Sequence, residues 1–227
     1  MSASFLVKGV NYAASPAEEQ VRAILGSALT ADWRQALIAR GFGWHVDVGA
    51  FSTPVTGGGA GTVFDQDQPE FGLSVASNYT LIPLRFHVAC QTPLIALDSD
   101  ESEILIAVDR VAAWAGDGTV TSETPINMRT NTSTNASGLT CFSAATGNIT
   151  NPTLGMELAH AVRVGDVQGT AANALWGELS LVYEPQNPPF VVGPACVYGY
   201  WGGTVATTGF ANLDFIVIAS SLITGLS

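Results

Sequence analysis

PPFVVGPACVYGYWGGTVATTGFANLDFIVIAS, residues 188–220, contains the two strand-forming runs that decide the fold. The runs, residues 190–201 and 210–220, are rich in Val, Ile, Phe, Tyr and Trp, which favour β-strands. Gly202 and Gly203 lie between them, and Asp214 is the one charged residue of the stretch. The pattern predicts two buried strands that close a β-sandwich and direct no reactive group at solvent.

The preceding residues, from position 42 onward, have the same strand-forming character. Phe42, Trp44, Val46 and Val48 alternate with smaller or polar residues, as in a half-buried strand. Further strand-like runs, separated by turn residues, cover residues 62–67, 73–76, 79–90, 104–114, 139–143, 154–164 and 174–184. Pro83 lies inside one of these runs and predicts a bulge or an edge position, because proline donates no hydrogen bond to a ladder.

The first forty residues differ from the rest because they show helical spacing. Residues 1–14 are expected to form an extended arm, and the serine, proline and glutamate of residues 15–18 predict the start of a helix that continues to about residue 28. A second short helix is expected over residues 30–40, ended by Gly41.

Together these segments predict an all-β protein, an antiparallel jelly-roll sandwich of about eight strands with one or two short N-terminal helices. The expected division is residues 1–40 for the arm and helical element, and residues 41–227 for the jelly-roll domain. The order of segments excludes the βαβ alternation of a parallel sheet.

Charged residues are scarce. They make up 12% of the 227 residues, and the net charge is −11, with Lys8 the single lysine. Scattered arginines and an acidic balance do not favour direct binding to nucleic acid, which needs clustered cations. A surface of uncharged small residues is expected where neighbouring copies of the chain later cover it.

Three widely spaced cysteines, Cys90, Cys141 and Cys196, fit neither a disulfide framework nor a zinc site. Cys90 and Cys196 lie in apolar strand-like runs, so we expect them to be buried free thiols, and we expect folding in a reducing compartment. The N-terminus has no pattern of a signal peptide, and the longest apolar stretch, residues 210–226, is too short and too polar to predict a transmembrane helix.

No residue pattern predicts catalysis, a cofactor or a metal. His45, His87 and His160 lie in three separate predicted strands, without a second ligand at metal-binding spacing, and are expected to be hydrogen-bonded strand histidines. In the run 154–164, alternation places His160 and Val162 on the same face as Met156.

Acidic residues occur close together at two places. Asp98, Asp100, Glu101 and Glu103 favour a solvated turn over a calcium site, because the rest of a calcium loop is missing. The same holds for the second group, Asp65, Asp67 and Glu70. Asp214 lies in an apolar run and is expected to be partly exposed or to face an interface.

The aromatic residues Tyr198, Tyr200 and Trp201 are the candidate interface. Alternation places the two tyrosines on one face, where they could form a ridge. Tyrosine and tryptophan favour protein interfaces and cores, and they also stack on sugars. An interface or a core position is favoured over a sugar platform, and a neighbouring subunit is expected first at this ridge.

The closing run VVGPACVYGYWGGTVATTGFANLDFIVIAS resembles the C-terminal strands of bacteriophage structural proteins, in its Gly-Pro-Ala entry, aromatic strand, Gly-Gly-Thr turn and final apolar strand. The acidic, lysine-poor, Thr/Ala/Gly-rich composition is similar to that of single jelly-roll capsid proteins. The resemblance implies a self-assembling capsid protein, major or minor, without catalytic residues. The chain lacks the basic N-terminal arm of many small RNA-virus coats, which favours a DNA phage.

The expected location is therefore the virion, after assembly in the host cytoplasm. The expected partners are copies of the chain, as a homo-oligomer, and other virion proteins, and contact with an internal viral membrane is compatible with this. The alternative is the receptor- or glycan-binding head of a phage spike or fibre. An enzyme is the third hypothesis, and no nucleophile or metal motif supports it.

Overall fold

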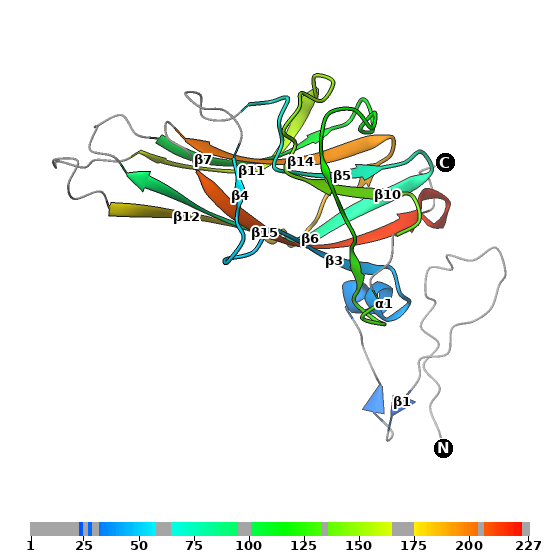
Figure 1. The fold of residues 1–227 in the computed structure, drawn as a ribbon. Helices are drawn as coiled ribbons and strands as arrows, with labels where there is room; N and C mark the ends of the chain where they lie inside the picture. Colours follow the sequence, from blue (N-terminus) through cyan, green and yellow to red (C-terminus); the bar gives the residue numbers. More distant parts are fainter. Residues whose placement is uncertain are drawn as a thin grey trace, which may run out of the picture.

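Two antiparallel sheets packed face to face make up the protein, and they are visible as the upper and lower layers of Figure 1. The computed structural model describes residues 23–24, 27–28, 32–57, 65–94, 101–132, 136–164, 175–203 and 207–223. Eight strands form the body of the sandwich. They are β3 (Gly43–Val48), β5 (Phe71–Val75), β6 (Tyr79–Leu94), β7 (Glu101–Asp109), β11 (Leu154–Val164), β12 (Leu175–Tyr183), β14 (Ala195–Gly203) and β15 (Thr208–Ala219).

These eight strands pair as in a jelly roll. The first pairs with the last (β3 with β15), the second with the seventh (β5 with β14), the third with the sixth (β6 with β12) and the fourth with the fifth (β7 with β11). One sheet thus has the order β12-β6-β15-β3 and the other β11-β7-β14-β5. We call this first-with-last pairing nested. It arises when a long antiparallel hairpin folds over on itself to form two sheets. The predicted all-β antiparallel sandwich is confirmed.

Shorter strands extend both sheets. β9 (Ile126–Asn127) adds to β3, while β10 (Leu139–Ser143) and β8 (Thr121–Glu123) continue the other sheet beyond β5. β4 (Val55–Thr56) pairs with β15, and β13 (Val191–Val192) pairs with β6. β8, β9 and β10 all belong to the long connection between β7 and β11, so this connection is an integral part of the sandwich.

The helical prediction is half correct. α1 (Trp33–Ala39) forms as expected, and Gly41 follows it at φ +89°, a backbone conformation that suits glycine. Residues predicted as an earlier helix instead include a pair of two-residue strands, β1 (Ala23–Ile24) and β2 (Ser27–Ala28). A short helix is only marginally stable without a surface to pack on, which α1 has. The predicted arm, residues 1–14, and the start of that helix lie outside the described residues.

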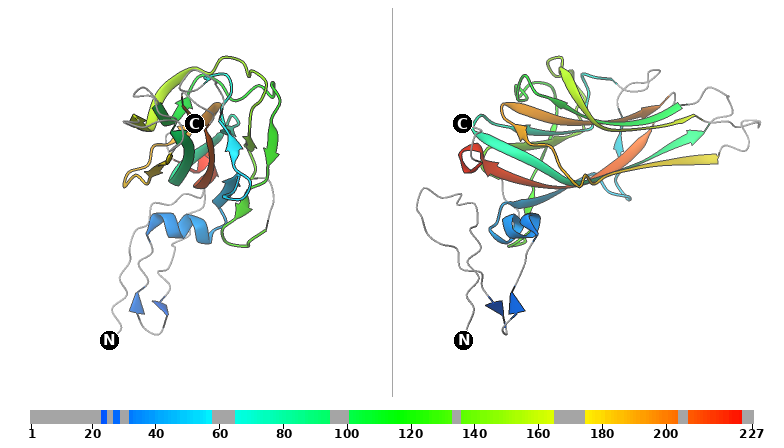
Figure 2. Two further views of the ribbon diagram at one scale, coloured as in Figure 1. Left: turned by 60° about the vertical axis from the view of Figure 1, so that its left-hand side comes forward. Right: turned by 180° about the vertical axis from the view of Figure 1, so that it is seen from behind.

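Three apolar clusters stabilise the fold. The largest lies between the sheets and includes Phe71, Phe86, Trp201 and Phe215. The second covers the outer face of the β14 sheet, beneath the connection from β7 to β11. The third joins α1 to the outer face of the other sheet, where Figure 1 and the turned views of Figure 2 show the helix.

Bulges occur in two of the long strands. The pairing of β6 with β15 shifts between Asp214 and Phe215, opposite Arg85 and Pro83. Proline thus marks a bulge in β6, as the sequence predicted. Among the described residues, Pro83 also lies between the stretches of β6 that pair with β13 and with β12, so at this point β6 has a strand partner only on the side of β15.

A bulge in β11 corrects the predicted face of His160 and Val162. The ladder with β7 shifts between Glu157 and Ala159, so that Leu158 and Ala159 both pack on the main core. The extra residue reverses the alternation beyond it. His160 and Val162 therefore lie on the opposite face from Met156.

Candidate functional site

The predicted interface residues Tyr198, Tyr200 and Trp201 are core residues. Their exposed fractions are 3%, 0% and 0%. The prediction of an exposed aromatic ridge on β14 is therefore wrong, although the two tyrosines do share a face, as alternation indicated. Of the readings that the sequence left open, the structure favours the core position.

Burial on both faces of β14 has a simple cause. Trp201 points into the main core, while Tyr198 and Tyr200 point to the outer face of the sheet. That outer face is covered by the connection between β7 and β11, with Trp114, Phe142 and Ile149 packed on the tyrosines. The sequence does not show that a Thr- and Asn-rich connection would fold back over this strand.

The two fully buried aromatic residues of β14, Tyr200 and Trp201, also have hydrogen-bond partners for their polar side-chain atoms. The hydroxyl of Tyr200 donates to the carbonyl of Gln66 at 3.0 Å, and the indole of Trp201 donates to the carbonyl of Val55 at 3.2 Å. The backbone N–H of Trp201 donates to Oε2 of Glu70 at 2.9 Å. These bonds fix β14 to the connection between β3 and β5.

Glu70 corrects the interpretation of the second acidic group, Asp65, Asp67 and Glu70. Its exposed fraction is 2%, so it is a structural acceptor for β14 and not part of a solvated turn. Asp65 and Asp67 do form a turn, in which the N–H of Asp67 donates to Oδ1 of Asp65. In the other group, Asp98 and Asp100 lie outside the described residues.

Cys90 and Cys196 are confirmed as buried free thiols, and Cys141 is a buried free thiol as well. Burial raises the pKa of both Cys90 and Cys141 to about 12. The pKa of Cys196 is raised further by burial. All three are therefore protonated near neutral pH and are poor nucleophiles.

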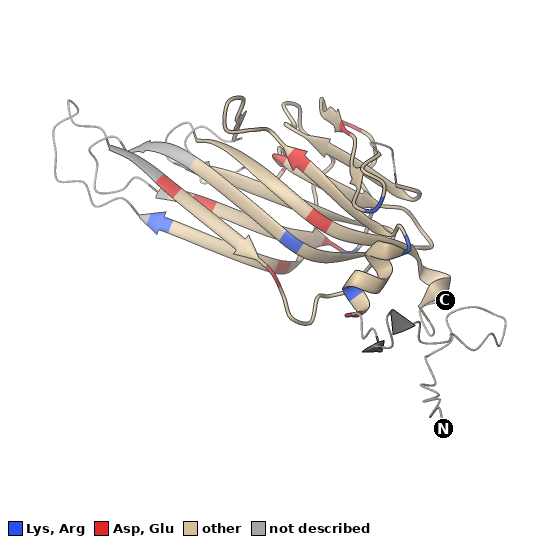
Figure 3. Ribbon diagram, turned by 90° about the horizontal axis from the view of Figure 1, so that it is seen from below, with Lys and Arg blue, Asp and Glu red and all other residues tan. Residues whose placement is uncertain are grey.

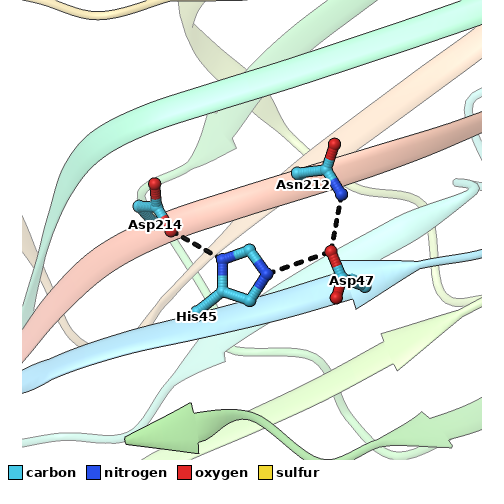
Figure 4. Close-up of polar contacts among 4 residues, drawn as sticks. All are labelled: His45, Asp47, Asn212 and Asp214. Carbon is cyan, nitrogen blue, oxygen red and sulfur yellow. Dashed lines mark hydrogen bonds and ion pairs between the residues drawn. The ribbon is translucent and has the colours of Figure 1, made fainter. Parts of the chain in front are cut away.

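A cluster of four polar side chains that contact one another lies on the outer face of the β3–β15 pair, and Figure 4 shows it in close-up. Register places His45 opposite Asp214 and Asp47 opposite Asn212. Nδ1 of His45 lies 2.6 Å from Oδ1 of Asp214, and Nε2 lies 3.0 Å from Oδ1 of Asp47. Asn212 donates its amide N–H to the same Asp47 oxygen. We call these four residues the His45 cluster.

This geometry favours the doubly protonated ring of His45. An ionised carboxylate only accepts hydrogen bonds, so a ring between two carboxylates is best satisfied when both of its nitrogens carry hydrogen. Burial lowers the pKa of His45, but the hydrogen bond to Asp214 and the charges of Asp47 and Asp214 outweigh it, so that the pKa is raised above 6.5. His45 is 31% exposed and Asp214 25%, which confirms the expected partial exposure of Asp214.

The His45 cluster is suited to sensing protons and poorly suited to catalysis. Both ring nitrogens are engaged, which leaves none free to take a proton from a nucleophile. The hollow lined by Phe51, Pro54 and Phe210 does not include His45. Within the described ranges, no group of three or more His, Cys, Asp and Glu residues is arranged to hold a metal ion.

The other two histidines are also hydrogen-bonded or paired, as predicted. Nε2 of His87 lies 3.1 Å from the hydroxyl of Ser180, and Nε2 of His160 lies 3.5 Å from Oε2 of Glu103. The sequence did not identify the partner of any histidine, and the one with a recognisable signal was the partner of His45. The signal for it was the nesting of the fold, because the first and last strands of a jelly roll are neighbours and both residues take outward positions.

The outer face that carries the His45 cluster has few charges, and Figure 3 shows acidic and basic residues interspersed along it. Arg85, for example, lies 3.8 Å from Glu184. Because charges of both signs are mixed on this face, it does not produce the electrostatic field of a single sign that would attract a polyanion. In the part of the chain that the structure describes, no helix is long and apolar enough to cross a membrane.

No protein-family model matches the chain, and no curated protein matches it either.

Proposed function

We propose that the chain is a self-assembling capsid protein, a major or minor component of the virion of a DNA bacteriophage. The observation that carries the proposal is the nested pairing of the eight strands, in which first pairs with last and fourth with fifth. Jelly rolls of this kind serve widely as shell-forming domains, although they also occur in lectins and enzymes. The resemblance of the closing strands to phage structural proteins points to the first of these uses.

The surface chemistry supports assembly. Several large apolar side chains are exposed, and the most exposed among the described residues are Phe51 at 80% and Val111 at 70%. Only 12% of the residues are charged, so a contact between neighbouring copies would bury few charged side chains. In a shell, the exposed apolar side chains would be covered by adjacent subunits.

The positions of Trp201, the thiols and His45 favour assembly over the two competing functions. A glycan platform built on Trp201 would need that ring at the surface, and it is fully buried. An enzyme would need a reactive group with a free base, while the thiols are buried and both nitrogens of His45 face carboxylates.

Assembly of the purified full-length chain tests the proposal. We expect light scattering across a concentration series to show discrete multimers such as trimers, pentamers or hexamers, and negative-stain images to show rings or closed shells. Because the net charge is −11, the same multimers should form after nuclease treatment. A chain that stays monomeric at every concentration, and is absent from purified particles, would contradict the proposal.

A further inference from the structure

Among the described residues, the main strand order of each sheet ends in two edge strands, and three of these four strands carry a feature that discourages further pairing. β8 and β9 are only 3 and 2 residues long. β11 is long, but its ladder is interrupted by two register shifts. Short edges and bulges are the means by which sheet proteins avoid joining edge to edge.

β12, the fourth of these strands, is neither short nor bulged. It pairs with β6 through nine consecutive residues without a register shift, and it contains neither proline nor lysine. It is the last strand of its sheet, so its outer side offers main-chain donors and acceptors. One of these acceptors, the carbonyl of Glu178, already binds Arg163 and has a second lone pair for a strand partner. Figures 1 and 2 show it as a long, straight strand at the margin of the sandwich.

The orientation of the backbone identifies which residues present these groups. Arg163 of β11 donates to the carbonyl of Glu178 at 2.9 Å, so that carbonyl faces away from β6. Alternate residues of an antiparallel strand direct their main-chain groups to the same side. Ser180 and Val182 therefore face outward along the edge together with Glu178.

We propose that two copies of the chain join through β12, as an antiparallel pair of strands related by a two-fold axis at Ser180. In this register Ser180 lies opposite Ser180 of the second copy, and Glu178 lies opposite Val182. The two sheets then become one continuous sheet across the axis. A two-fold contact is self-complementary, so one strand supplies both sides of it.

Side-chain chemistry supports a second copy as the occupant. Glu178 is the only charged residue of β12, and this register keeps it away from its own equivalent. It meets Val182 instead, whose side chain is 51% exposed in the single chain. Like charges directly opposite one another would destabilise the pair, and none face each other here.

The first experiment changes the charge at Val182 and measures the oligomeric state of the full-length chain. Val182→Glu would place two glutamates opposite each other at both ends of the contact, so the dissociation constant should rise at least tenfold. Val182→Lys would face Glu178 and should leave the dimer intact. Ile126→Glu, on the short β9 edge of the same sheet, is the matched control and should have no effect. If Val182→Glu dimerises as tightly as the unchanged chain, or if no dimer forms, the proposal is overturned.

The second experiment tests the register by cross-linking. Opposed residues in a hydrogen-bonded antiparallel pair lie about 5.5 Å apart at Cα, within disulfide range. Under mild oxidation Ser180→Cys should therefore form a covalent dimer, and the three native thiols should not interfere because they are buried. Two copies of Val182→Cys would be about 13 Å apart along the strands and should stay unlinked. Linkage through Val182→Cys instead would overturn the register.

This inference deepens the proposed function, since it assigns one of the contacts between capsid subunits. The two experiments distinguish the β12 contact from assembly into a shell. Dimers that link through Ser180→Cys but never form larger multimers would support the β12 contact and contradict the shell. Larger multimers that are insensitive to Val182→Glu would support the shell and contradict the contact.

Discussion

The two closing strands, β14 and β15, are similar in sequence but differ in their surroundings. Each lies in the middle of its own sheet, β14 between β7 and β5, and β15 between β6 and β3. β14 is buried on both faces because the long connection from β7 to β11 covers its outer side. The outer side of β15 is covered by α1 only around Ile216 and Ile218, and further along it carries Asn212 and Asp214. The covering segment, rather than the strand, decides which side chains reach solvent.

The largest loss in the free energy of unfolding should come from a substitution on the inner face of β14. Trp201→Ala leaves a cavity between the sheets, and the free energy of unfolding should fall by about 3–5 kcal/mol. Chemical denaturation with tryptophan fluorescence and circular dichroism measures it. Trp33→Ala on α1, where the side chain is 43% exposed, is the control and should cost less than about 1 kcal/mol. Equal losses in the two variants would contradict the contrast between buried and exposed tryptophan.

A smaller loss in the free energy of unfolding should come from replacing Glu70, whose carboxylate accepts a hydrogen bond from the backbone of β14. Glu70→Ala removes the carboxylate to which the N–H of Trp201 donates, and the free energy of unfolding should fall by about 1–3 kcal/mol. Glu70→Gln keeps an acceptor oxygen of similar reach and should lose less. If the two variants lose the same amount, the hydrogen bond to Trp201 is not what Glu70 contributes.

The smallest change in the free energy of unfolding should come from the pairing of His45 with Asp214 of β15, and this contribution should depend on pH. Because the pKa of His45 is raised in the folded chain, its pairing stabilises fully below pH 6.5 and is lost as the pH rises through the folded pKa. The free energy of unfolding should therefore decline between about pH 6 and 8, by less than about 1 kcal/mol at this partly exposed site.

Asp214→Asn tests this dependence, because it removes one of the two carboxylates that hold the proton on His45. Denaturation at several pH values should show a flatter profile for Asp214→Asn than for the unchanged chain. The control is His87→Gln, which alters a histidine of the same sheet whose ring lies near Ser180 and not between carboxylates. If only the control flattens the profile, the His45 cluster is not the source of the pH dependence.

Much of the sandwich could be predicted locally. The strands at residues 139–143 and 154–164 form over those same residues, because turn residues bound them and their apolar positions alternate. The run 104–114 ends earlier, at Asp109, whose carboxylate accepts from the N–H groups of Val111 and Ala112 and turns the chain. Such a turn depends on one side chain, which composition does not single out.

The sequence by itself determined the all-β architecture, the buried thiols and the scarcity of reactive groups, because these follow from composition and the spacing of neighbouring residues. Only the tertiary structure decided that Tyr198, Tyr200 and Trp201 are core residues, that Glu70 holds β14, and that His45 meets Asp214. It also decided that β12 is the last strand of its sheet. Each of these depends on residues far apart in the chain, and local patterns do not encode which segments will be neighbours.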